Sequence, residues 1–190
     1  AIVQIRPLVA QRIAEAGLDD IVFPFDPAKF NQVVPLGSNL FYAMPTQPQT
    51  QELLSRETKF FDILRAHGLI DELAQIAASV IEELNATFGP DDTSHPLFRR
   101  FNMNDQLYNR LNQIVAMRRK VGNAALPPED FALMLTVPFT LSAEQIGPAF
   151  PAALKDRILE IRAGNAAQMV AELDGLFETI DPQKNISAIS

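Results

Sequence analysis

The amino-acid sequence predicts a mainly α-helical fold, an irregular bundle of about five to seven helices with a Pro-rich, aromatic extended arm. Apolar residues recur at intervals of three and four over most of the chain, which is the spacing of one helical face. Residues 18–50 instead carry five prolines, which exclude a long helix there. We expect a single helical domain over residues 1–190, with residues 18–50 as the arm and 181–190 as a short C-terminal tail.

The first two helices are predicted from apolar spacing and helix signals. One begins near Arg6, because Pro7 is tolerated best in a first turn, and Gly17 ends it. The second runs over residues 50–67 from a threonine cap, and Gly68 occupies the position of a left-handed C-cap.

The middle of the chain holds the most regular helical pattern. Residues 69–88 carry apolar side chains at every third or fourth position until Gly89-Pro90 ends the segment. Asn104 is predicted to cap a further helix that extends to about Val121, with Gly122 beyond its end.

The C-terminal third is less regular. Pro127-Pro128 is typical of a helix start, yet the apolar run 131–137 fits a buried strand as well, and both alternatives stay open. Residues 142–145 match a capping box that opens a helix of about one turn. Two final helices are predicted at residues 151–163 and 165–180, with Gly164 between them.

The arm contains more large aromatic residues than a free linker would expose to water, because their exposure is costly. It therefore packs on a surface, either the chain's own helices or a neighbouring subunit. Residues 32–34 or 39–42 are candidates for short strands within it. The aromatic residues that we expect to make a subunit contact are Phe23, Phe25, Phe30, Phe41 and Tyr42.

Composition excludes several classes of protein. The chain has no cysteine, so it has neither disulfides nor thiolate metal sites, and no apolar run reaches the roughly 20 residues of a membrane span. The N-terminal residues lack the pattern of a secretory signal. We therefore expect a cytoplasmic protein without membrane insertion, or a virion protein if its source is a virus.

Basic residues are concentrated in one segment of an acidic chain. The formal net charge is −7, yet residues 97–120 have a local net charge of +5. This distribution predicts a contact with an acidic partner, such as a second copy of the chain, or with nucleic acid. The cationic residues are Arg99, Arg100, Arg110, Arg118, Arg119 and Lys120.

Catalytic and cofactor motifs are missing from the sequence. There is no phosphate-binding loop, dinucleotide fingerprint or hydrolase elbow, and only two histidines occur. Asp91, Asp92 and His95 share one loop and form the sole candidate enzyme site, although a polar turn explains them better. We expect no catalytic residue, no cofactor and no metal.

Three functions follow, in order of preference. The first is a non-enzymatic structural or assembly subunit of a larger complex, such as a virion or filament, which associates with itself or with other subunits. The second is a nucleic-acid-associated protein that uses the basic segment 97–120. The third is an enzyme with its site near Asp91, Asp92 and His95.

Overall fold

Helices dominate the structure, a computed structural model that describes residues 2–18, 26–46, 50–89, 98, 101, 103–173 and 175–179. Nine α-helices and a two-stranded sheet lie in the described residues, so the prediction of a mainly α fold is confirmed. The helices are α1 (Ile2–Glu15), α2 (Leu36–Phe41), α3 (Gln51–Leu54), α4 (Thr58–Ala66), α5 (Ile70–Phe88), α7 (Asp105–Val121), α8 (Pro128–Thr136), α9 (Ala143–Ile146) and α10 (Ala152–Glu172). Strands β1 (Ala43–Pro45) and β2 (Phe177–Thr179) form the sheet, and short 3₁₀ turns η1 (Asn123–Ala125), η2 (Pro138–Thr140) and η3 (Gly147–Ala149) join helices.

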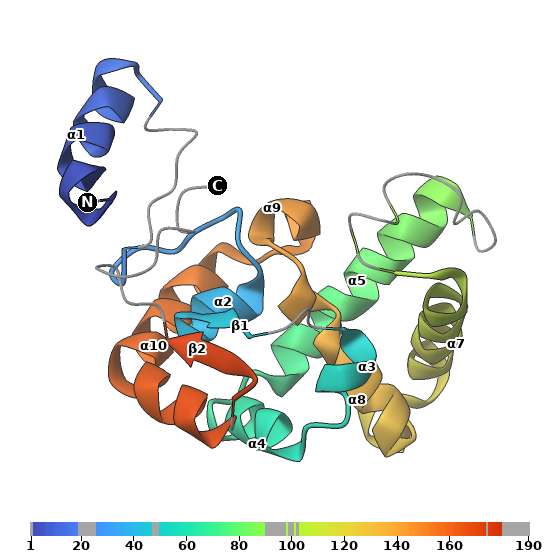
Figure 1. Ribbon diagram of the computed structural model, residues 1–190. Coiled ribbons are helices and arrows are strands. Elements are labelled where there is room, and N and C mark those ends of the chain that lie inside the picture. Colours follow the sequence, from blue (N-terminus) through green and yellow to red (C-terminus); the bar gives the residue numbers. More distant parts are fainter. Residues whose placement is uncertain are drawn as a thin grey trace.

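Helix α5 crosses the main body of the molecule, which is the part formed by α2 to α10 and the sheet, and other helices pack along it. It contacts α7 and α8, whereas α10 packs mainly on α2. In Figure 1, α10 and α7 lie at opposite ends of the body, and α1 stands apart from it. The chain therefore presents two separate helical ends and one detached helix.

An aromatic cluster fills the core between α2, α4 and the sheet. The ring of Phe41 lies 4.9 Å from that of Phe177 and 6.0 Å from that of Phe139, and Phe139 stacks edge-on against Phe60 at 4.6 Å. All four residues are buried. Rings in such tilted and edge-to-face pairs stabilise the core beyond the area that they bury.

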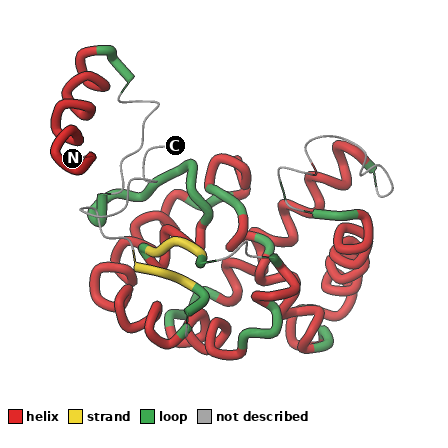
Figure 2. Tube along the Cα trace, in the orientation of Figure 1, coloured by secondary structure: helices red, strands yellow, loops and turns green. Residues whose placement is uncertain are grey.

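The small sheet joins distant parts of the chain. Strand β1 pairs antiparallel with β2, so that Met44 lies opposite Glu178 (Figure 2). Leu36 N–H also donates a hydrogen bond to the carbonyl of Leu141 at 2.8 Å. The arm is thereby tied to the C-terminal half of the chain.

Local helix signals were predicted well. Asn104 caps α7, where its side chain accepts a hydrogen bond from Leu107 N–H at 2.8 Å, and Ser142 with Gln145 forms the expected capping box at α9. Gly68 adopts the left-handed conformation with φ of 62°. The run 131–137 lies in α8 up to Thr136, so the helix alternative is correct and the strand alternative is wrong.

The N-terminal half differs from the prediction at three places. Helix α1 begins at Ile2, before Arg6, and includes Pro7. The predicted helix 50–67 is two helices, and Ser55 Oγ donates a hydrogen bond to the carbonyl of Glu52 where α3 ends. The strands suggested at 32–34 and 39–42 are both wrong, because 32–34 are bends and 39–41 belong to α2, and the strand β1 follows at residues 43–45.

The C-terminal prediction was wrong in two respects. Gly164 does not divide the segment, since α10 continues through it to Glu172. The predicted helix 165–180 ends there, and residues 177–179 form β2 instead. Pairing with a strand more than 100 residues away overrides the local helical pattern, because it satisfies the backbone groups of both segments.

Candidate functional sites

The aromatic residues of the arm pack on the chain itself wherever the structure describes them. Phe41 is fully buried and Tyr42 nearly so, while Phe30 is half-buried with its ring 5.6 Å from that of Phe150. These three rings are thus covered by the chain's own residues, which leaves little of them for a neighbouring subunit. The other two predicted contacts, Phe23 and Phe25, lie outside the described residues.

A buried arginine holds the arm in place. The segment 26–35, here named the strap, has no helix or paired strand of its own beyond a single bridge at its end. Arg162 of α10 donates hydrogen bonds from Nη2 to the carbonyls of Pro27 and Lys29, at 2.7 and 2.8 Å. Its Nη1 donates to the carbonyl of Asn39 at 3.2 Å. One side chain therefore joins the strap, α2 and α10.

The side chain of Asn39 fixes the second half of the strap. Its Nδ2 donates to the carbonyl of Asn31 at 2.7 Å, and its Oδ1 accepts from the N–H of the same residue at 2.9 Å. Both side chains are buried. This reciprocal pair replaces the backbone partners that a strand or helix would supply.

Arg162 is unusual for a charged residue, because it is only 5% exposed. No carboxylate among the described residues forms an ion pair with it, and its Nε has no hydrogen-bond partner there. Burial lowers the pKa of Arg162, and the charges of Tyr42 and Asp26 oppose that change. Its guanidinium lies 5.2 Å from the centre of the Tyr42 ring, a cation–π distance that offers partial compensation.

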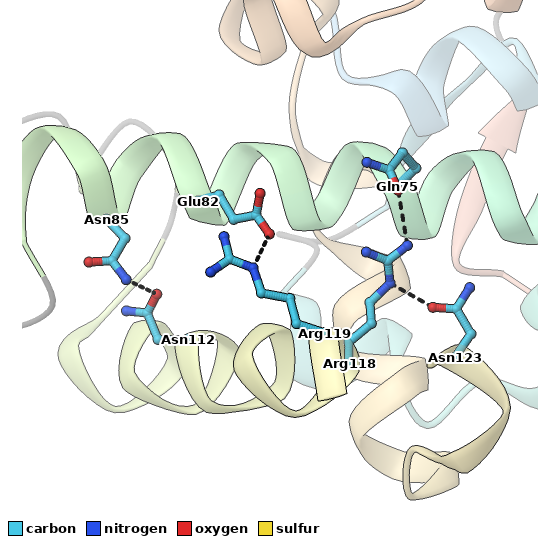
Figure 3. Close-up of polar contacts among 7 residues, drawn as sticks. All are labelled: Gln75, Glu82, Asn85, Asn112, Arg118, Arg119 and Asn123. Carbon is cyan, nitrogen blue, oxygen red and sulfur yellow. Dashed lines mark hydrogen bonds and ion pairs between the residues drawn. The ribbon is translucent and has the colours of Figure 1, made fainter. Parts of the chain in front are cut away.

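The basic segment forms a polar seam between α5 and α7 (Figure 3). Arg119 Nε donates to a carboxylate oxygen of Glu82 at 2.9 Å, while Arg118 donates to Gln75 and Asn123 at 3.1 and 2.6 Å. Figure 3 shows the contacts of Arg118 with Gln75 and of Arg119 with Glu82 between the two helices, with the pair Asn85–Asn112 farther along. Asn123, the other partner of Arg118, lies in η1.

These contacts divide the predicted cations into two kinds. Arg119 is paired with Glu82, and Arg110 is paired with Asp130 at 2.9 Å, so both charges are compensated within the chain. Among the described residues, Arg118 bonds only to side-chain amides, so no carboxylate compensates its charge, and Lys120 is exposed without an ion-pair partner. Two further predicted residues, Arg99 and Arg100, lie outside the described residues.

Helix α1 exposes apolar side chains. Leu8 is 55% exposed, and Val9 and Ile13 are partly exposed. The next residues on the side of Leu8 are polar, since Gln11 lies three positions later and bonds to Glu15 at 2.8 Å. Leu8 is thus an exposed apolar side chain among polar neighbours, whereas Val9 and Ile13 lie together on a different side of the helix.

The proposed enzyme loop cannot be placed, since Asp91, Asp92 and His95 all lie outside the described residues. Within the described ranges, no three His, Asp or Glu side chains are arranged to hold a metal ion. No helix in those ranges is long and apolar enough to cross a membrane.

Comparisons with models of protein families, with curated proteins and with solved structures find no match to this chain.

Proposed function

We propose that this chain is a non-enzymatic assembly subunit, and that its helix α1 packs against another copy of the chain. The observation that carries the proposal is the exposed side chain of Leu8 on α1, with Val9 and Ile13 partly exposed on another side of the same helix. A helix of 14 residues is marginally stable alone in water, because most helical stability in proteins comes from packing of the apolar face. A partner surface would supply that packing.

The strap supports the same function. Arg162 and Asn39 hold residues 27–39 firmly on the body. A segment that is already held loses less entropy when the chain binds a neighbour, which favours association. A filament or a virion is a setting in which helix α1 would join identical subunits.

The second candidate is nucleic-acid binding through the end of α7. Arg118 and Lys120 favour it, because their charges are not compensated by carboxylates in the described residues. Arg110 and Arg119 argue against it, since both are paired within the chain. We therefore keep nucleic acid as the alternative.

Static light scattering of the purified chain over a range of concentrations tests the proposal. We expect oligomers for the natural sequence, and a shift to monomer when Leu8 and Ile13 are both replaced by glutamate. Gln11→Glu combined with Arg12→Gln is the matched control, because it changes the net charge by the same amount, −2, and removes no apolar side chain from α1. A chain that remains monomeric at every concentration, with α1 helical by circular dichroism, would contradict the proposal.

A further inference from the structure

A small cavity lies where segments from distant parts of the chain meet. Helix α2 contacts η2 and β1, and β1 pairs with β2 (Figure 1). Between these elements and the end of α3 is a cavity of about 140 Å³. Its inner wall is formed by Leu54, Phe139 and Phe177, which are all buried, and the exposed residues Pro35 and Pro45 lie at its rim. A concave, mainly apolar site at the junction of several elements is typical of small-molecule binding.

The wall of the cavity selects a neutral ligand of limited size. Every described residue that lines it is uncharged, and burial of a charge without a partner is costly. Phe139 and Phe177 are held in place by Phe41, whose ring lies 6.0 and 4.9 Å from theirs. An apolar cavity of about 150 Å³ holds one benzene ring. The cavity therefore fits a neutral molecule with a single six-membered ring.

Thr140 places one hydrogen-bonding group in this wall, and the chain determines which kind. Its hydroxyl donates to the carbonyl of Val137 at 3.1 Å and accepts from Nε2 of Gln51 at 3.0 Å. The proton is thus in use, whereas a hydroxyl oxygen has a second lone pair. Thr140 therefore offers the cavity an acceptor, which calls for a donor on the ligand.

Two polar groups near Thr140 have hydrogen-bonding capacity that the described residues do not use. Gln51 is fully buried behind the wall, and its Oε1 has no hydrogen-bond partner there. Ser38 lines the cavity and is only 5% exposed, and its hydroxyl bonds to no other described residue. Buried polar groups are normally paired. The set points to a polar group that comes from outside the chain.

We propose that this cavity binds a neutral single-ring molecule that carries a hydroxyl group, such as a phenol. The ring packs between Phe139 and Phe177, and its hydroxyl donates to Oγ1 of Thr140 while it accepts from the hydroxyl of Ser38. Gln51 is a positioning residue, because its N–H keeps the Thr140 hydroxyl turned toward Val137. The site lies within one chain, so the inference does not depend on the proposed assembly.

Titration of the natural chain with phenol, followed by the amide signals in NMR, tests for the site. We expect saturable shifts at Ser38 and Thr140, with a Kd of about 1 mM or tighter. Benzoate is the control, because it has the same ring with a negative charge and should leave these signals unchanged. Absence of a saturable shift with phenol at these residues would overturn the inference.

Thr140→Val tests the hydrogen bond, because valine keeps the shape and lacks the acceptor. Phenol should bind about ten-fold more weakly relative to toluene, a ligand of the same size without a donor. The ratio of the two affinities is independent of a general loss of stability, since both ligands occupy one cavity. Thr58→Val, at an exposed position of α4, is the matched control and should leave the ratio unchanged. An unchanged ratio in Thr140→Val would contradict the proposal.

Leu54→Phe tests the location, because it adds a ring to the wall. Phenol and toluene should both bind at least about ten-fold more weakly. Leu53→Phe is the matched control, since it makes the same change at the preceding residue of α3, which is not part of the wall. Circular dichroism checks that both variants are folded. A folded Leu54→Phe chain that binds phenol as the natural chain does would overturn the inference, and if this variant does not fold, the affinity ratio in Thr140→Val decides.

Discussion

The guanidinium of Arg162 lies 2.7 Å from the carbonyl oxygen of Pro27, a residue 135 positions earlier in the chain. The contact is buried at the arginine and joins the last long helix to the strap. Because Arg162 also bonds to Lys29 and Asn39, this side chain holds the first half of the strap, while Asn39 holds the second half. The arrangement makes the N-terminal arm dependent on a residue far from it in sequence.

Removal of this arginine should release the strap. Arg162→Met leaves three carbonyls without their charged donor, so we expect a loss of about 2–4 kcal/mol in the free energy of unfolding. Urea denaturation measures the loss, and limited proteolysis should cut the variant within residues 26–35.

Arg157→Met is the control for Arg162→Met, because it removes an arginine of the same helix that also donates to two carbonyls, those of His67 and Gly68. Its side chain is 41% exposed, so we expect a loss of only about 1 kcal/mol and no new cleavage in the strap. Equal losses in the two variants, with an intact strap in both, would show that Arg162 does not hold the arm.

Tyr42 should make stability depend on pH in the alkaline range. Burial raises the pKa of Tyr42 above 10.0, with a further increase from Asp26, while the charge of Arg162 lowers it in part. The folded state therefore holds the phenolic proton more tightly than the unfolded state does. This contribution to stability is fully present below pH 10 and is lost as pH rises through the folded-state pKa.

Comparison of the natural chain with Tyr42→Phe isolates that contribution. The difference in unfolding free energy between the two proteins, measured in urea at pH 8 and at pH 11, should shift against the natural chain at the higher pH. A difference that stays constant over this range would contradict the raised pKa.

Predictions from the sequence succeeded where structure is determined by neighbours in the chain. The caps at Asn104 and Ser142 and the turn at Gly68 depend on hydrogen bonds and backbone angles within a few residues. They failed where distant contacts decide. Residues 177–179 have the apolar spacing of a helix but pair with residues 43–45 in the sheet. Nothing in the sequence next to them predicts that strand.

The candidate sites were predicted only in part for the same reason. The arginines of α7 stood out by composition, but their partners Glu82 and Gln75 lie on another helix and were not identifiable from spacing. Arg162 was missed, although its position offers a signal. It follows the buried Ile161 and lies four residues after the buried Ile158, on the apolar side of α10, where a charge needs an explanation.

Nucleic-acid binding would depend on the two uncompensated cations of α7. If the alternative function holds, replacement of Arg118 and Lys120 by glutamate should abolish salt-sensitive binding to a single-stranded oligonucleotide in fluorescence anisotropy. Arg110→Gln should change binding much less, because Asp130 already compensates that charge. No binding by the natural chain at low salt would remove the alternative.

Two glycines in helices should respond in opposite ways to the same added methyl group. A Cβ at Gly37 in α2 would lie 3.0 Å from Cδ1 of Phe139, whose ring is fixed against Phe41 and Phe60. The carbonyl oxygen of Phe139 would also lie 3.3 Å from this Cβ, and backbone does not give way as a flexible side chain does, so Gly37→Ala should cost about 1–3 kcal/mol. At Gly164 the methyl meets no atom, so Gly164→Ala should raise the free energy of unfolding of the monomer by about 0.5–1 kcal/mol. Urea denaturation of both variants measures the two effects, and a stabilising Gly37→Ala would show that α2 does not pack so closely on η2.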